Sequence, residues 1–146
     1  MAPDELKIFP LYEGLDDASL KHIALSSPSK VIIPKGTTIL KQDAISSDIY
    51  FIFDGILDIQ VRQGSVNEAR SGTVLGEFAI LKRGGIRRTA TVIASTDVVC
   101  VTINVNEFLA MLEKDKDLHI KILENLGIML EDRCKTMNYN IRNLMY

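Results

Sequence analysis

The sequence has few of the residues that build metal centres and catalytic pairs. Its only histidines are His22 and His119, and both lie in segments with the spacing of helices. Histidine is the commonest metal ligand in proteins, yet no His-x-His pair occurs in the strand-like part of the chain. No serine or cysteine stands out as a nucleophile with a histidine as its base. We therefore predict no metal site, no catalytic residue and no enzymatic activity.

Cysteines and long apolar runs are equally scarce. Cys100 and Cys134 are far apart and form no Cys-x-x-Cys motif, so we expect two reduced thiols in a cytoplasmic protein. Cys100 lies in the apolar run VVCVTI, which favours a place in the core. No run approaches the roughly 18 apolar residues that a membrane span needs. The first residues, MAPDELKIFP, have neither the basic leader nor the apolar centre of a signal peptide.

Positive charge is not in excess. The chain has 17 lysines and arginines against 19 aspartates and glutamates, and its net charge is −2. Binding to nucleic acids generally needs a basic face that neutralises phosphates. Arg83, Arg87 and Arg88 form a small basic patch, but no aromatic residue is interleaved with them. We therefore predict no direct nucleic-acid partner.

What the sequence does have is a long series of short apolar runs. Its 146 residues, 47% of them hydrophobic, are enough for one domain with a real core. Between residues 30 and 103 the runs are KVII, TTIL, DIYFIF, ILDIQV, TVL, TATVIA and VVCVTI. Many short strands separated by turns are typical of a β-sandwich or barrel. The polar stretch RQGSVNEARSG, residues 62–72, is expected to form an exposed hairpin tip.

Helical patterns precede and follow the strands. Near the amino terminus, Asp16 or Asp17 can cap a short helix. After the strands, NEFLAMLEKD predicts a helix of about three turns, and Asp115 or Asp117 then begins a long helix. The fold class is therefore mainly β with flanking helices. The expected single domain, 1–146, consists of an N-terminal helical segment (1–29), a β-roll (30–103) and C-terminal helices (104–146).

The long helix carries an apolar seam. Leu130, Met137 and Leu144 recur every seven residues, and Cys134 and Ile141 fill the intermediate positions. Such a heptad repeat is typical of parallel helix pairs. We expect the seam to form a homodimer, and the alternative is that it packs against the strands of its own domain.

Residues 76–92, GEFAILKRGGIRRTATV, contain the candidate binding residues. Gly76 tolerates a positive φ and a close approach of backbone or ligand. Arg88 presents a planar fork of donors that matches two phosphate oxygens, with the hydroxyl of Thr89 beside it. Glu77 does not suit a pure anion site, but a carboxylate can accept a hydrogen bond from a sugar hydroxyl. The stretch therefore indicates a sugar phosphate. The alternative is an ordinary surface ion pair of Glu77 with Arg88, worth about 0–1 kcal/mol.

Other stretches extend this pattern over almost the whole chain. They are FPLYEGLDDASLKHIA near the amino terminus, YFIFDGILDI in the strands, and GTVLGE, GEFAIL and RRTATV around the candidate site. Together they resemble the cyclic nucleotide-binding domain family of cyclic-AMP-dependent kinase regulatory subunits, bacterial catabolite-activator regulators and cyclic-nucleotide-gated channels. Its phosphate-binding cassette begins Gly-Glu-apolar-Ala-apolar and ends Pro-Arg-small-Ala-Thr-Val. The resemblance implies an antiparallel β jelly roll, a cupin-like double-stranded β-helix.

The resemblance implies a role for each position of the cassette. Glu77 would accept the ribose 2′-hydroxyl, and Arg88 would hold the cyclic phosphate. Gly76, Phe78 and Ala79 would line the site with backbone groups, and Thr89 and Ala90 would complete it.

Three positions depart from the family pattern. The proline before the key arginine is Arg87 here, and the loop KRGGIR is one or two residues longer than usual. The Gly-Asp pair after the third strand is Asp43-Ala44 here, in a turn rather than at the ligand.

In members of the family that the sequence resembles, the long C-terminal helix folds over the base of the bound nucleotide. The residues that would reach the base here are Arg133 and Cys134, and a guanidinium can stack on a purine or donate to its edge. The alternative is that Arg133 pairs with Glu131 or Asp132 on a solvated helix face.

We therefore predict a sensor or regulatory module that binds a cyclic nucleotide, cAMP or cGMP, and signals through its C-terminal helix, with a protein effector as a further partner. The residues do not distinguish the two nucleotides. One alternative is a protein-interaction domain that keeps the fold and no longer binds nucleotide. Another is a domain cut from a larger regulator or channel.

Overall fold

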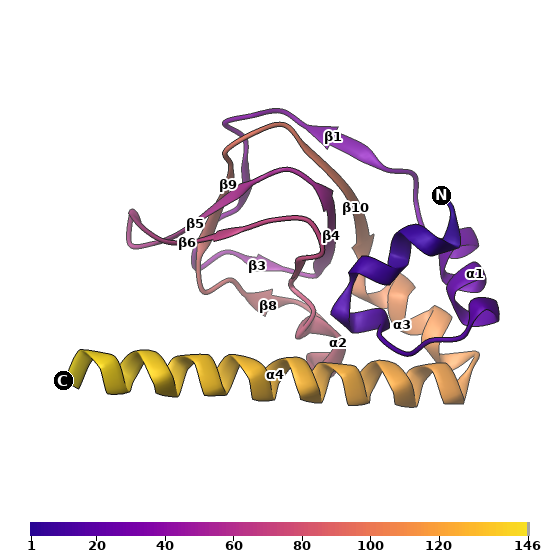
Figure 1. Ribbon diagram of the computed structural model, residues 1–146. Helices are drawn as coiled ribbons and strands as arrows, with labels where there is room; N and C mark the ends of the chain where they lie inside the picture. Colours follow the sequence, from indigo (N-terminus) through magenta and orange to yellow (C-terminus); the bar gives the residue numbers. More distant parts are fainter. Residues whose placement is uncertain (146) are drawn as a thin grey trace.

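Ten strands form the centre of the described molecule (Figure 1). This computed structural model describes the backbone of residues 1–145 and the side chains of residues 1–136. The strands are β1 (Val31–Ile33), β2 (Thr38–Leu40), β3 (Ile45–Ser46), β4 (Asp48–Asp54), β5 (Leu57–Val61), β6 (Gly64–Ala69), β7 (Val74–Leu75), β8 (Ile86–Arg87), β9 (Thr91–Ala94) and β10 (Val98–Asn104). Each apolar run predicted as a strand contains one of them. The structure adds the two-residue strands β3 and β8 and the polar strand β6.

The strands pair into two four-stranded sheets and one small sheet. The orders are β1-β10-β4-β7 and β2-β9-β5-β6, and β3 pairs with β8. The described pairings are antiparallel. Ile52 and Cys100 of the first sheet pack in one cluster with Leu57 and Val92 of the second, so the two sheets face each other across an apolar core. This arrangement confirms the jelly-roll prediction, and buried Cys100 lies in that core as expected.

A second apolar cluster joins the roll to the helices. The N-terminal elements η1 (Pro3–Ile8), η2 (Pro10–Tyr12) and α1 (Asp17–Ser26) lie at one end of the roll (Figure 1). Fully buried Phe9 makes edge-to-face contacts with Phe51 and Phe53 of β4, at ring-centroid distances of 5.3 and 5.0 Å. Asp16 caps α1 by accepting a hydrogen bond from the Ser19 N–H at 2.8 Å. Of the two predicted caps, Asp16 is therefore the correct one.

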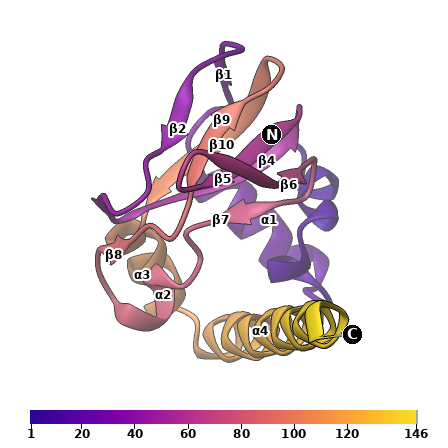
Figure 2. The same ribbon diagram turned by 90° about the vertical axis from the view of Figure 1, so that its left-hand side faces the viewer.

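Three helices follow the roll or interrupt it. They are α2 (Ala79–Lys82) between the strands, and α3 (Val105–Glu113) and α4 (Lys116–Met145) after them. Asn104 caps α3 by accepting from the Asn106 N–H, and Asp115, not Asp117, accepts from the Leu118 N–H at 3.1 Å to start α4. With 30 residues, α4 is about 45 Å long. It runs along one side of the molecule past α2 (Figures 1 and 2).

The first half of α4 is anchored to the domain. Leu118, Ile122 and Leu126 are buried. Buried Asn125 donates to the carbonyls of Leu11 and Glu13 at 2.8 and 3.0 Å. These contacts satisfy the buried amide and hold the helix against η2.

The opposite face of α4 is apolar and exposed. Ile120, Leu123 and Leu130 are 55, 39 and 44% exposed, and Cys134 is exposed as well. The alternative that the seam packs on the domain's own strands is therefore wrong for Leu130 and Cys134. The other predicted seam residues, Met137, Ile141 and Leu144, lie outside the described side chains.

The polar segment 62–72 contains more structure than expected. The turn itself is limited to Arg62 and Gln63, whose φ values are 51° and 68°. The following residues form strand β6, which pairs along β5. The predicted exposed hairpin is confirmed, since β5 and β6 pair antiparallel around this turn and β6 is mostly exposed. The prediction missed that residues 64–69 form a paired strand, because β6 has no apolar alternation to mark it.

The chain has two free thiols, and no described helix could span a membrane. Cys100 is buried and Cys134 exposed, without a disulfide between them. Within the described residues, no helix combines the length and apolarity needed to cross a bilayer.

Candidate functional site

The two charged residues predicted for the site are buried in the cassette. Glu77 is 2% exposed and Arg88 is 5% exposed. Glu77 lies between Gly76 and α2, and Arg88 follows β8. The alternative that these residues form a surface ion pair is therefore wrong. The fold brings them from the two ends of the loop into one interior site.

Backbone pairing places Arg88 across the sheet from residues 43–48. Its N–H donates to the Ala44 carbonyl at 2.8 Å, and its own carbonyl accepts from the Asp43 N–H at 2.8 Å. Asp43 has a φ of 69° and therefore a left-handed backbone conformation. The Asp43-Ala44 turn, where the sequence departs from the family pattern, thus lies next to the cassette.

The Arg88 guanidinium is hydrogen-bonded through one nitrogen, and its Nε has no partner. Its Nη2 donates to the Ser46 hydroxyl at 3.0 Å and to the Asp48 carbonyl at 2.5 Å. Its buried Nε has no hydrogen-bond partner. Burial lowers the pKa of Arg88, although an arginine remains a cation in proteins. A buried cation with an unused donor is suited to receive an anion.

The backbone of Gly76 lies directly against this guanidinium. A Cβ at Gly76 would lie 2.2 Å from Arg88 Nη1 and 2.7 Å from the Asp48 carbonyl oxygen, and Gly76 has a φ of 81°. Both the space and the backbone conformation therefore require glycine at this position.

Glu77 is paired with the long helix. Its Oε1 forms an ion pair with Nη2 of Arg133 on α4, without hydrogen-bond geometry. The Arg133 guanidinium also lies 4.9 Å from the ring centroid of Phe78. The alternative that Arg133 pairs with Glu131 or Asp132 is thus wrong. Glu131 instead pairs with Lys135 at 3.0 Å.

A cavity of about 660 Å³ connects the cassette with α4. This volume lies within the range of about 300–1,000 Å³ typical of small-molecule sites. The predicted site residues that line it are Gly76, Glu77, Phe78, Arg88, Thr89, Ala90 and Arg133. Ala79 is not among the lining residues: its side chain is fully buried in the core, and its N–H donates to the Gly76 carbonyl at 3.1 Å. Cys134 is also not a lining residue.

The wall opposite the cassette could not be recognised from a motif. Its apolar lining residues are Leu40, Ile59, Ala69, Val74, Leu75 and Val92. They come from β2, β5, β6, β7 and β9, so only the closure of the roll brings them together. In the sequence, Ala69 lies in the predicted hairpin tip and the others are ordinary strand residues.

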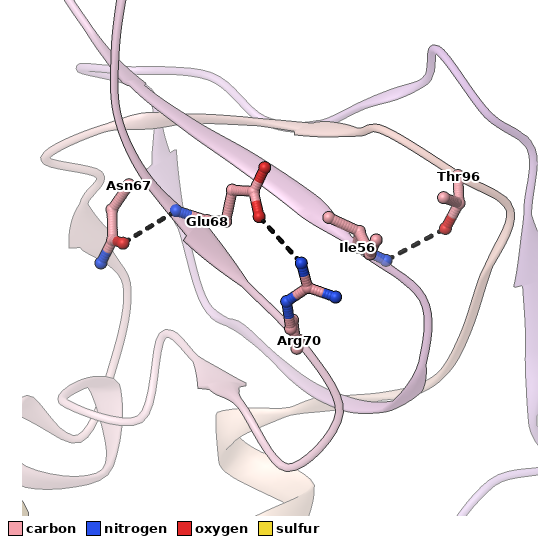
Figure 3. A network of polar contacts seen from close by, with 5 residues as sticks. All are labelled: Ile56, Asn67, Glu68, Arg70 and Thr96. Atoms are coloured by element: carbon pink, nitrogen blue, oxygen red, sulfur yellow. Dashed lines mark hydrogen bonds and ion pairs between the residues drawn. The ribbon is translucent and has the colours of Figure 1, made fainter.

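Polar residues of β6, together with Arg70 directly after it, also line the cavity. Figure 3 shows the polar contacts among them. Arg70 is paired with Glu68 at 3.1 Å, and Asn67 accepts from the Glu68 N–H at 2.8 Å. To the right of them in Figure 3, the Thr96 hydroxyl accepts from the Ile56 N–H at 3.0 Å and holds the start of β5. Sequence reasoning missed Asn67 and Arg70 because they lie in the segment predicted as a hairpin tip.

The cavity therefore combines three kinds of surface. The cassette contributes a buried guanidinium and a buried carboxylate, the strands contribute an apolar wall, and α4 contributes Arg133 at the mouth. A ligand that fits this combination has an anionic group, a hydroxyl group and a flat apolar part.

Comparison with known proteins identifies the family. The model of the cyclic nucleotide-binding domain matches residues 30–115, more than half of the chain. The chain therefore belongs to the cyclic nucleotide-binding domain family, and the resemblance seen in the sequence is confirmed.

Curated relatives include channels and kinase regulatory subunits. The potassium/sodium hyperpolarization-activated cyclic nucleotide-gated channel 3 of Homo sapiens is 29% identical over 105 residues, which are 72% of this chain and 13% of the channel. The cAMP-dependent protein kinase regulatory subunit of Candida albicans is 31% identical over 84 residues, 58% of this chain and 18% of that protein. The chain thus spans less than a fifth of either relative.

Solved structures share the fold. The N-terminal domain of a transcriptional regulator from Streptomyces coelicolor has a TM-score of 0.76 at 20% identity, and the match covers 89% of this chain and 94% of that one. The catabolite activator protein of Thermus thermophilus has a TM-score of 0.74 at 19% identity, with 92% of this chain and 62% of that chain covered. At these identities the match establishes the architecture alone.

Proposed function

We propose that the domain binds a 3′,5′-cyclic nucleotide, cAMP or cGMP, and acts as a regulatory module rather than an enzyme. The observation that carries the proposal is the buried Arg88, which has an unpartnered Nε and lines one cavity together with the buried Glu77. The guanidinium would bind the cyclic phosphate. The carboxylate would accept the ribose hydroxyl.

The other cassette residues complete the proposed binding mode. Gly76 allows the close approach of the phosphate, and exposed Thr89 adds a hydroxyl beside it, followed by Ala90. Phe78 and Arg133 lie at the mouth of the cavity, where a base would project between the cassette and α4. In this binding mode Ala79 contributes by fixing the α2 turn and not by touching the ligand.

Titration calorimetry with cAMP and with cGMP tests the proposal. We expect a dissociation constant in the micromolar range or tighter, equivalent to about −8 kcal/mol, because charge-assisted hydrogen bonds contribute roughly 1.5–3 kcal/mol each. A noncyclic 5′-monophosphate is the control and should bind more weakly. Absence of heat and of a thermal shift at millimolar cyclic nucleotide would favour the second candidate, an interaction domain with an unused site. The occupied Glu77–Arg133 pair is the observation that favours that candidate.

We further infer that two copies associate through α4. The predicted seam of Leu130, Cys134, Met137, Ile141 and Leu144 extends toward the start of the helix. Ile120, Leu123 and Gly127 continue the same heptad spacing, and Ile120 and Leu123 are exposed. A self-complementary apolar stripe of this length supports a symmetric parallel dimer.

Two variants of similar character test this association. Replacing both Leu123 and Leu130 with glutamate should give a monomer by light scattering at micromolar concentration, because like charges would face each other across the seam. Ile128→Glu is the control, since Ile128 is 57% exposed but lies off the seam. A monomeric wild type, or equal dissociation of the control, would contradict the inference.

The cellular setting and the effector are also proposals. The two free cysteines support a reducing compartment such as the cytoplasm. The share of the relatives that the chain covers supports a role as the sensor part of a larger regulator or channel. In such a protein, movement of α4 would reach the effector.

A further inference from the structure

Within the described side chains, residues 130–136 of α4 are attached to the domain through one arginine. Residues 130–136 have exposed side chains, in contrast to the buried Leu118, Ile122 and Leu126. The Lys135–Glu131 pair and the Thr136 hydrogen bond to the Asp132 carbonyl stay within the helix. Among these seven residues, Arg133 joins the helix to the rest of the domain through its ion pair with Glu77 and its contact with the Phe78 ring.

Glu77 needs this partner because its carboxylate is buried. An uncompensated buried charge is strongly destabilising. Arg88 directs its Nη2 toward Ser46 and Asp48, whereas Arg133 forms the ion pair with Glu77. The Arg133 side chain is itself 47% exposed, so it reaches in from solvent to neutralise an interior carboxylate.

We propose that Arg133 is a displaceable strap that pins α4 to the cassette in the ligand-free protein. The ribose hydroxyl of a bound nucleotide competes for the same carboxylate, and Arg133 then transfers to the base. This competition between the ribose and Arg133 for Glu77 rests on the proposed function. The pinning of α4 by the Glu77–Arg133 pair in the ligand-free protein does not. Because a ligand shifts an equilibrium only through its differential contacts with two states, the exchange of partners on Glu77 supplies the difference that moves the helix.

Hydrogen exchange of the ligand-free protein tests the pinning. A helix end without tertiary contacts opens more readily. Arg133→Gln and Glu77→Gln should each speed exchange of the backbone amides of residues 130–136 by about tenfold, the factor that corresponds to a contact of about 1.4 kcal/mol. The double variant should add nothing further, since both changes remove the same pair. Lys135→Gln, which removes a pair within the helix, is the control and should leave exchange nearly unchanged.

Either of two results would overturn the pinning: exchange like that of wild type in both single variants, or the same acceleration in the control. The competition for Glu77 is measured separately, by NMR of the side-chain Nε–H of Arg133. This resonance is assigned by its absence from the spectrum of Arg133→Gln. Saturating cAMP should shift this resonance in the wild type. If calorimetry shows binding and the resonance stays in place, the competition is wrong. If cAMP does not bind, the proposed function and the competition fail together, and the ligand-free exchange still decides the pinning.

Discussion

Replacing Arg88 with alanine is expected to weaken the binding of cAMP or cGMP by about 100-fold or more. Charge-assisted hydrogen bonds contribute roughly 1.5–3 kcal/mol each, and a phosphate would lose at least two of them together with the buried positive charge. Glu77→Ala should have the smaller effect, about tenfold, because it removes the contact to a neutral hydroxyl. Titration calorimetry of both variants measures the difference.

Arg88 also supports the fold, and the experiment has to separate the two roles. Without it, the Asp48 carbonyl loses a donor at 2.5 Å, and an unsatisfied buried acceptor costs about 1–3 kcal/mol. Denaturant unfolding of the same variant therefore accompanies the binding measurement. Lys82→Ala is the control, since it removes an exposed positive charge of α2 without touching the cavity lining. If the Arg88 and Glu77 variants both bind like wild type, the ligand site lies elsewhere.

Gly76→Ala is expected to abolish most of the binding although it changes no charged residue. The added Cβ would lie 2.2 Å from Arg88 Nη1 and 2.7 Å from the Asp48 carbonyl oxygen. The guanidinium would have to move away from the position in which it faces the cavity. The φ of 81° adds a conformational cost of about 1–2 kcal/mol. We expect at least a tenfold loss of affinity and a lower free energy of unfolding.

The same cassette offers a matched control for this change. A Cβ at Gly84 would meet nothing within 4 Å, and Gly84 has no positive φ. Gly84→Ala should therefore bind and unfold like wild type, as measured by the same calorimetry and denaturant titration. Equal behaviour of the two alanine variants would show that the Gly76 backbone does not position Arg88.

The attachment of Arg133 and the proposed binding site are adjacent in the cassette. Gly76 positions the guanidinium that would hold the phosphate, and the next residue, Glu77, is the one to which α4 is tied. The cassette and the helix therefore share adjacent residues. A ligand bound in the cavity would therefore act directly on the attachment of α4, without a relay through the core.

The sequence by itself determined the parts of the protein that depend on near neighbours. The apolar runs predicted seven of the strands, because strand periodicity repeats every two residues. Asp16 and Asp115 started their helices because a cap reaches a donor only three residues away. The residue types Gly76, Glu77 and Arg88 along the loop suggested a sugar-phosphate site, and the surrounding strand pattern and the family resemblance decided between that site and a surface ion pair.

Only the tertiary structure decided what surrounds those residues. The Asp48 carbonyl that holds Arg88 comes from a strand 40 positions earlier, and a carbonyl group, present in every residue, leaves no signal in a sequence. Arg133 is 56 positions from Glu77, and its pairing depends on how α4 packs against η2 and passes the cassette. The apolar wall forms from five strands, and Ala79 faces the core because of the direction in which α2 turns. Such contacts join distant segments, so they are set by the packing of sheets and helices and not by local periodicity.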